Sequence, residues 1–397
     1  MRSLHLVDET RGPSAPRFAF WELGFRPFYL LASTFAALSI PLWALQFSGV
    51  LRHAYLAGPI WHAHEMLFGF ALAVIVGFLF TAGRNWTDQA TPRGVVLAGL
   101  AALWLAARVL VLTPFGWAAA VANVAFPLAA GIALAIPFVR VRNRRNYFFI
   151  ALLMLMAVAA AFVHLAQLGV AGPPPAWAGL QLGLDVVLFI ICVMAGRVVP
   201  MFTNNAVPGA AAGREPWLEK AALGSVLLLL AADVVGLKAA PLAVVASAAC
   251  VAHSVRWLLW RPWRTHKVPL VWVLHLAYLW VPVHLALRAC AELGLVTSSS
   301  AVHALTVGAA GGLIIGMMTR TARGHTGRPM RADRFDTSCY WLVLASGLVR
   351  VVVPLLAPGL LLVAVEVSAA LWSGGFGLYA VRYWPVLTRA RLDGKPG

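Results

Sequence analysis

The chain has 397 residues, of which 61% are apolar and only 11% are charged. That charged share is roughly half of what a soluble domain carries, so the chain has too little polar surface to cover a water-facing globule. The formal net charge of +17 does not indicate a nucleic-acid partner, because nearly all lysines and arginines lie in short connections between apolar runs, where they fix topology. We therefore expect an integral membrane protein that has the lipid bilayer around it and no nucleic-acid partner.

The apolar residues occur in runs of about 20, the length that an α-helix needs to cross roughly 30 Å of hydrocarbon. The sequence lacks the alternating segments of about ten residues that form a transmembrane barrel. The expected fold class is therefore all-α, a polytopic integral membrane helical bundle. In chain order, the runs and the proline, glycine and serine residues between them predict about twelve helices, near residues 26–48, 60–82, 95–113, 117–139, 147–170, 177–201, 217–237, 240–260, 269–291, 300–320, 337–356 and 359–386.

The connections between the predicted helices alternate in charge. The even-numbered connections and both tails are basic, whereas the odd-numbered connections carry little more than Arg52 and Lys238. Because basic loops stay on the cytoplasmic side, we expect a cytoplasmic tail over residues 1–25, a twelve-helix transmembrane domain over 26–387 and a second cytoplasmic tail over 388–397. The start of the chain holds no apolar stretch, so we expect no cleavable signal peptide and insertion from the first spanning helix.

The second, sixth and tenth predicted helices end at the cytoplasmic side in similar polar phrases. These phrases begin at Gly83, Gly196 and Met318, at near-equal spacing. The spacing hints at three repeats of four helices, as internal repeats occur in many transporters, although the chemistry of helix ends alone would also produce it. The glycines between Gly308 and Gly316 are expected to let a neighbouring helix approach closely.

The four cysteines lie in separate apolar runs, at Cys192, Cys250, Cys290 and Cys339. No C-x-x-C or C-x-x-C-H motif occurs, which argues against thiolate zinc sites, iron–sulfur clusters and covalently attached haem. We expect these cysteines to pack as small side chains within the helices.

Ionisable residues at membrane depth form one layer toward the outer face, here called the outer layer. Such residues are costly in hydrocarbon, so each indicates function or a buried partner. Five histidines from four predicted helices share this depth: His62, His64, His164, His284 and His303. The same layer holds three arginines and three carboxylates, namely Arg108, Arg288, Arg350, Glu65, Asp185 and Glu366. Only His253 and His275 are intramembrane histidines toward the inner side.

Several histidines at one depth on different helices are what a haem or copper site needs, because neutral imidazole is the commonest metal ligand and bundle sites are built from facing helices. We expect at least two of the five outer-layer histidines to be metal ligands, with hydrogen-bonded packing as the alternative for each. The outer-layer arginines would hold haem propionates, or would pair with the carboxylates as buried ion pairs.

The phrase from Trp61 to Met66 has two geometric interpretations. On a regular helix, His62 and His64 point about 200° apart and cannot chelate one metal together, and His62 shares a face with Glu65 and Met66. His64 would then face another cofactor or donate a hydrogen bond to a carboxylate behind a metal site. In an extended segment, by contrast, the two histidines share a face and chelate together.

Several phrases resemble the NnrS family of bacterial membrane proteins. They run in order along most of the chain: Gly24–Phe28, Trp61–Met66, Gly77–Leu79, Asn85–Thr87, Gly196–Asn204, His303–Ala309, Met318–Arg320 and Gly324–Pro329. The resemblance implies a multi-pass protein of the bacterial cytoplasmic (inner) membrane with twelve helices that carries copper and non-covalent, b-type haem. It also implies a role in defence against nitric oxide and nitrosative stress, often alongside denitrification. The histidine and arginine assignments rest on depth and spacing rather than on the resemblance.

Our first hypothesis is a haem and copper protein that binds or redox-converts nitric oxide, or repairs damage from it. Nitric oxide is small and apolar and partitions into the bilayer, so a metal in the outer leaflet would meet it directly. The partners would be nitric oxide or a product of it and an electron donor that the sequence does not identify. Whether the protein is a nitric-oxide-linked oxidoreductase or only binds its ligand stays open.

Two other functions compete with this hypothesis. The first is a metal or small-molecule transporter with a histidine-lined outer cavity and no bound haem, although transporters usually place their substrate site near the midplane. The second is a conventional haem–copper oxidase or nitric oxide reductase subunit. This one is less favoured, because the sequence has no adjacent histidine pair and no H-x-x-x-H pattern.

Overall fold

The computed structural model describes residues 18–47, 50, 55–56 and 58–394. Predictions that concern the first 17 residues, the last three or Arg52 lie outside the described residues. The described part of the chain is built of helices and has no strand, and one isolated bridge pairs Phe18 with Arg389. The predicted all-α fold class is therefore confirmed.

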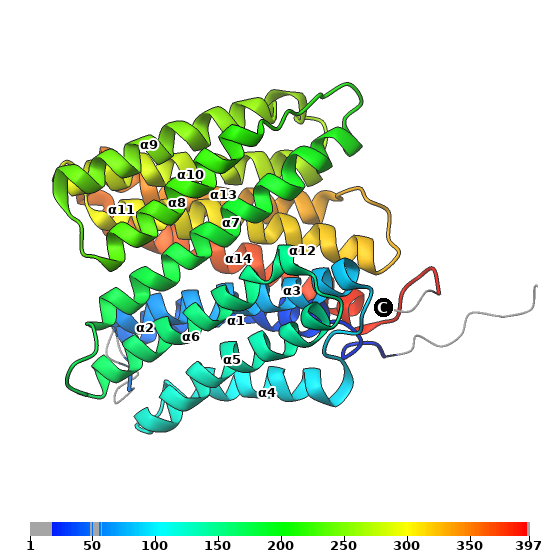
Figure 1. The fold of residues 1–397 in the computed structure, drawn as a ribbon, viewed down its shortest axis with the longest axis horizontal. Coiled ribbons are helices and arrows are strands. Elements are labelled where there is room, and N and C mark those ends of the chain that lie inside the picture. The colour runs from blue at the N-terminus through cyan, green and yellow to red at the C-terminus, as the bar shows by residue number, and fades with distance from the viewer. Residues whose placement is uncertain (1–17, 48–49, 51–54, 57, 395–397) are drawn as a thin grey trace, which may run out of the picture.

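Twelve helical rods make up the described part of the chain (Figure 1). The uninterrupted rods are α1 (Phe25–Phe47), α4 (Gly94–Leu110), α5 (Gly116–Arg140), α6 (Phe148–Gln167), α7 (Ala176–Ala206), α8 (Pro216–Val234), α9 (Ala239–Leu259), α10 (Pro269–Glu292), α13 (Arg334–Leu356) and α14 (Leu361–Thr388). The second rod joins α2 (Gly58–His64), a π-helical segment (Glu65–Ala71) and α3 (Leu72–Thr87). The tenth joins α11 (Ser298–His303), a second π-helical segment (Ala304–Gly311) and α12 (Gly312–His325). Each predicted helix corresponds to one of these rods.

Ten of the rods are long and apolar enough to cross a membrane. The other two are α4, which is apolar but has 17 residues, and α8, whose 19 residues include Glu219, Lys220 and Asp233. The prediction of a polytopic membrane protein is confirmed by these spans.

The two ends of the described chain lie together on one side of the bundle. The amide of Ala19 donates to the carbonyl of Thr388 at 2.8 Å. The Arg26 guanidinium donates to the carbonyls of Leu387 and Arg389 at 3.1 and 2.7 Å. Most successive rods pack side by side and α14 packs along α1, so the end of the chain closes the bundle against its beginning. Both ends on one side agree with an even number of crossings, and loop charge predicts that this side is cytoplasmic.

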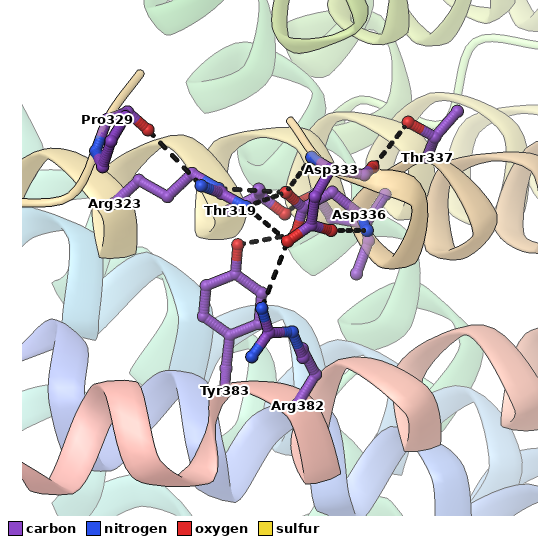
Figure 2. Close-up of polar contacts among 9 residues, drawn as sticks. Thr319, Arg323, Pro329, Asp333, Asp336, Thr337, Arg382 and Tyr383 are labelled. Carbon is purple, nitrogen blue, oxygen red and sulfur yellow. Dashed lines mark hydrogen bonds and ion pairs between the residues drawn. The ribbon is translucent and has the colours of Figure 1, made fainter. Parts of the chain in front are cut away.

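A polar cluster joins α12, α13 and α14 near the same side (Figure 2). The guanidinium of Arg323 donates to Asp333 at 2.9 Å and to Asp336 at 2.5 Å, and the Tyr383 hydroxyl donates to Asp336 at 2.7 Å. Asp333 also caps the first turn of α13, where its side chain and that of Asp336 each accept the other's backbone N–H. This cluster fixes the connection between α12 and α13 to the bundle.

Close packing of the tenth rod depends on glycine, as the sequence predicts. A Cβ atom added at Gly308 would lie 2.5 Å from the ring of Trp280, and one added at Gly347 would lie 3.0 Å from the Cα of Gly308. No real Cβ fits at the first distance without a shift of its neighbour. The glycine therefore lets α10 and α13 reach the second π-helical segment.

Candidate metal centre in the outer layer

The two histidines of the second rod lie on regular helix. α2 runs to His64 and the π-helical segment begins at Glu65, so the helical alternative for this phrase is the observed one. His64 is fully buried, whereas His62 packs on Trp43 with the ring centroids 5.0 Å apart. The two histidines leave the rod in different directions and do not bind one metal ion together.

Glu65 fixes the orientation of the His64 ring through the nitrogen that points away from His164. The Nδ1 of His64 donates to Oε1 of Glu65 at 2.8 Å. The same carboxylate oxygen accepts a hydrogen bond from Arg108, which also donates to the side-chain oxygen of Asn123. Glu65 is fully buried and Arg108 nearly so, so they form a buried ion pair rather than two separate charges. The other oxygen of Glu65 has no hydrogen-bond partner within the described chain.

The Nε2 of His64 faces the Nε2 of His164 on α6 at 3.1 Å. The planes of the two rings are 82° apart. On the far side of His164, Nδ1 lies 3.2 Å from the Tyr55 hydroxyl, and that hydroxyl donates to the backbone carbonyl of His164 at 3.0 Å. Burial raises the pKa of Tyr55 to about 12, so its hydroxyl keeps the proton that it donates.

The positions of the ring protons decide what can bind between His64 and His164. Because Nδ1 of His64 donates to a carboxylate, its Nε2 carries a lone pair. When the Tyr55 proton lies on the carbonyl of His164, Nδ1 of His164 is the donor and both Nε2 atoms carry lone pairs. Two lone pairs at 3.1 Å require a proton between them. A metal ion bound at about 2 Å from each nitrogen needs the two rings to move apart. When the Tyr55 proton points to Nδ1 instead, His164 Nε2–H donates to His64 and the pair is neutral.

His284 and His303 have the same arrangement on α10 and α11. Nδ1 of His284 donates to the carbonyl of Ala301 at 2.7 Å, and its Nε2 is buried with no hydrogen-bond partner among the described residues. Nδ1 of His303 donates to the carbonyl of Ser299 at 2.7 Å. Each imidazole is therefore fixed at Nδ1 and directs Nε2 away from its anchor.

His62 and Arg350 lie near His303 at the outer ends of their rods. His62 is within electrostatic range of both residues, and its Nδ1 is buried with no hydrogen-bond partner in the part of the chain that the structure covers. Arg350 donates to the hydroxyl of Ser299 at 3.3 Å. The structure thus gathers these three predicted site residues into a second group, apart from His64 and His164.

The predicted outer-layer arginines differ in their partners. Arg288 donates to Asp185 at 3.4 Å and to both carboxylate oxygens of Asp233. Arg108 and Arg288 thus form ion pairs with carboxylates, which is one of the two alternatives predicted from the sequence. Arg350 has a hydroxyl partner and no ion pair within the described residues. Glu366 is exposed on α14.

Two residues of the outer layer gain importance only from the structure. Tyr55 and Asp233 are not among the predicted site residues, although a search of the outer connections and helix ends for polar side chains would have found both. Asn123 is expected from its position to join helices, and it does so by accepting from Arg108 and donating to Ala119 at 2.9 Å.

The inner histidines have a different environment. Nδ1 of His253 lies 2.6 Å from the hydroxyl of Tyr278, and Nε2 lies 3.0 Å from the carbonyl of Ala222. Nε2 of His275 donates to the hydroxyl of Thr203 at 2.8 Å, because that hydroxyl itself donates to a backbone carbonyl. With both nitrogens satisfied, His253 is a structural residue rather than a ligand.

The donor set of the outer layer fits copper. Within the described residues no group of three or more histidine, cysteine or acidic side chains is placed to hold a metal ion. Among those residues, the four ligands of a structural zinc site are not assembled. Imidazole is a common copper and iron ligand. Two imidazoles that face each other across one ion need their Nε2 atoms about 4 Å apart, so copper binding would move His64 and His164 apart from their 3.1 Å contact. The buried Nε2 of His284, which has no hydrogen-bond partner among the described residues, would be free to bind haem iron.

A family model described as NnrS protein matches residues 19–391, nearly the whole chain. The chain belongs to the NnrS family. The resemblance carried by the sequence phrases is thereby confirmed, and NnrS membership supports a role in the response to nitric oxide at the level of the family. The NnrS family is associated with metal and haem binding. No protein with a curated description matches the chain.

Proposed function

We propose that this NnrS-family protein holds copper and haem among its outer-layer histidines, in the bacterial inner membrane, and binds or redox-converts nitric oxide there. The observation that carries the proposal is the shared orientation of four imidazoles. His64, His164, His284 and His303 each have Nδ1 within hydrogen-bond distance of a carboxylate, a hydroxyl or a carbonyl. In metal sites a ligating histidine almost always donates its other ring N–H in this way, which fixes the tautomer and raises the basicity of the ligating nitrogen.

The His64 and His164 pair is the proposed copper site. Glu65 holds the proton of His64 on Nδ1, and Arg108 holds Glu65 in place. Tyr55 turns the ring of His164 toward His64. Copper held by His64 and His164 would supply one-electron redox chemistry. The hydrogen bonds at Nδ1 set the tautomers of both histidines before a ligand binds. The buried surroundings keep bulk water away from the two Nε2 atoms.

The second group of residues (His62, His303 and Arg350), together with His284, is the proposed haem-binding region. His284 offers a buried Nε2 without a partner among the described residues, and His62 and His303 lie nearby at the same depth. Arg350, whose side chain is not neutralised by a carboxylate within the described chain, is the arginine best placed to pair with a haem propionate. Haem would supply a site for binding nitric oxide. Because this region lies in the outer layer, nitric oxide dissolved in lipid reaches it without crossing the membrane.

The test is metal analysis and a reduced-minus-oxidised optical spectrum of protein purified from cells supplied with haem and copper. We expect copper to be lost in His64→Gln and His164→Gln, and a haem band to be lost or shifted in His284→Gln. The matched control is His253→Gln, which changes a buried histidine whose nitrogens both have protein partners. A wild-type protein free of both metals would overturn the proposal.

One observation favours a metal or small-molecule transporter as the second candidate. The second and tenth rods each change from α- to π-helix directly after an outer-layer histidine, and transporters often build substrate sites on interrupted helices in corresponding positions of repeats. The sixth rod, α7, has no such segment, so a three-fold repeat stays a prediction. Copper uptake into proteoliposomes, measured beside a His64→Gln variant, separates the two functions.

A further inference from the structure

A cavity of about 300 Å³ lies between the starts of α6 and α8 and the middle of α7, on the side that loop charge predicts to be cytoplasmic. It is at the opposite end of the bundle from the outer-layer histidines. Two kinds of residue line it: the cations Arg145, Arg197, Arg214 and Lys220 with the carboxylate Glu219, and the apolar residues Phe148, Phe189, Val193 and Leu223. The outer-layer metal site uses none of these residues.

The charge at the cavity is strongly positive. Its one carboxylate, Glu219, accepts two hydrogen bonds from Arg256 at 2.8 and 2.6 Å and is further bound by Arg214 at 3.3 Å. Arg145 and Lys220 are exposed, and no ion pair within the described residues neutralises them. The site therefore has four cations and one carboxylate that is already paired, which favours an anionic ligand.

Arg197, one of the cations that line the cavity, is held in place beside the apolar lining residues. The Arg197 guanidinium donates to the side-chain oxygen of Asn146 at 2.8 Å. It also lies over the rings of Phe148, Phe149 and Trp86, at 5.4, 5.7 and 5.9 Å from their centroids. These contacts order the charge before any ligand binds.

The apolar lining residues of the cavity, its apolar wall, lie beside the charged ones along the helices. Phe189 precedes Arg197 by eight residues on α7, which at 1.5 Å per residue is about 12 Å along the helix. The lining of the cavity thus changes from charged to apolar over about 12 Å along α7. A ligand that fits has a negative charge joined to an apolar chain.

We propose that this cavity binds one anionic phospholipid of the cytoplasmic leaflet. Its phosphate lies between Arg145, Arg214 and Lys220, and the upper part of an acyl chain packs on Phe189 and Val193. Basic pockets between transmembrane helices at the cytoplasmic side are a recognised setting for anionic headgroups. A zwitterionic lipid would bring an amine next to four cations, and a soluble phosphate would leave the apolar wall in contact with water.

The test is native mass spectrometry of the full chain in mild detergent with added phosphatidylglycerol or phosphatidylcholine that have the same acyl chains. We expect the wild type to retain phosphatidylglycerol preferentially. The double variant Arg145→Gln/Lys220→Gln should lower that retention on the order of tenfold, because each cation near a headgroup contributes to binding. The matched control Arg264→Gln/Lys267→Gln removes one arginine and one lysine from another cytoplasmic connection and should leave retention unchanged.

A second variant tests the apolar wall without changing charge. Leu223→Trp places a larger side chain in the cavity, so phosphatidylglycerol retention should fall several-fold, and glycerol phosphate should not displace the lipid from the wild type. Equal retention of the two lipids, or an equal loss in the control double variant, would overturn the proposal. Displacement by glycerol phosphate together with normal binding by Leu223→Trp would show a site for small anions and would overturn it too.

Discussion

The Nε2 atoms of His64 and His164 face each other 3.1 Å apart, although the residues are 100 positions apart in the chain. The Nδ1 of His64 donates to Glu65, and the Nδ1 of His164 lies beside the Tyr55 hydroxyl. Each imidazole therefore presents Nε2 to the other, and the groups behind the rings decide which nitrogen carries the proton. The proposed copper site can therefore be tested by changing Glu65 or Tyr55 as well as by changing the histidines.

Replacement of Glu65 with glutamine should weaken copper binding without removing either imidazole. The amide no longer holds the proton of His64 on Nδ1 by charge, and loss of such an anchoring group typically lowers metal affinity by about 10- to 100-fold. The measurement is titration of the purified, folded protein with monovalent copper in competition with a chelator. Glu366→Gln, which changes an exposed glutamate of the same layer, is the control. Unchanged affinity in Glu65→Gln would contradict the proposed copper site.

Removal of the Arg288 guanidinium should destabilise the fold strongly. Arg288 binds both Asp185 and Asp233, so Arg288→Met leaves two carboxylates at membrane depth without their cation. Breaking a buried ion pair by removing one partner costs about 3–5 kcal/mol, and we expect a loss of that order in the free energy of unfolding in mild detergent. Arg382→Met removes an exposed ion pair with Asp333 and should cost no more than about 1 kcal/mol. Similar losses in both variants would contradict the expectation.

The sequence predicts the rods well because hydrocarbon selects long apolar runs. The predicted helix over 269–291 matches α10 (Pro269–Glu292) closely. The second, sixth and tenth rods run further at their C-terminal ends than predicted, and α7, for example, continues to Ala206 rather than to residue 201. These ends are polar but keep their helical hydrogen bonds, so the apolar run that marks the helix in the sequence stops before the helix does.

The depth of the site residues is predictable from sequence, and their pairing is not. Loop charge and helix position place His64 and His164 in one layer, but which faces meet depends on the rotation of each rod about its axis. The π-helical segment that begins at Glu65 changes that rotation, and no periodic signal in the sequence marks it. For the same reason the sequence leaves open whether Arg108 pairs with a carboxylate or with a propionate, and the contact with Glu65 appears only in the structure.

Acidification should loosen the start of α13. Burial alone would raise the pKa of the Asp333 carboxyl, but the hydrogen bond from the Asp336 amide and the charges of Arg382 and Arg323 outweigh it and hold the pKa below its usual 3.8. A carboxyl whose pKa is lower in the folded state stabilises that state above the unfolded pKa, and this contribution is lost as the pH falls. We expect faster hydrogen exchange in the first turn of α13 below about pH 4.

The control for this prediction is Asp333→Asn, which removes the ionisable group. Its exchange rate in that turn should already be high at neutral pH and should change less on acidification than in the wild type. Asp88→Asn, which changes an exposed carboxyl in another cytoplasmic connection, should behave as the wild type does. The prediction is wrong if Asp333→Asn and the wild type respond to pH in the same way.

Two glycine-to-alanine changes should have opposite effects on stability. At Gly308 a Cβ would lie 2.5 Å from the Trp280 ring, so Gly308→Ala overpacks the contact between α10 and the second π-helical segment and should cost about 1–3 kcal/mol. At Gly224, on α8, a Cβ has no heavy atom of another residue within 4 Å among the described neighbours. Gly224→Ala should therefore stabilise by about 0.5–1 kcal/mol, because alanine loses less conformational freedom in a helix. The free energies of unfolding of both variants, measured in the same detergent, check the signs. A stabilising Gly308→Ala would mean that Trp280 moves aside freely and that close packing at this rod does not depend on glycine.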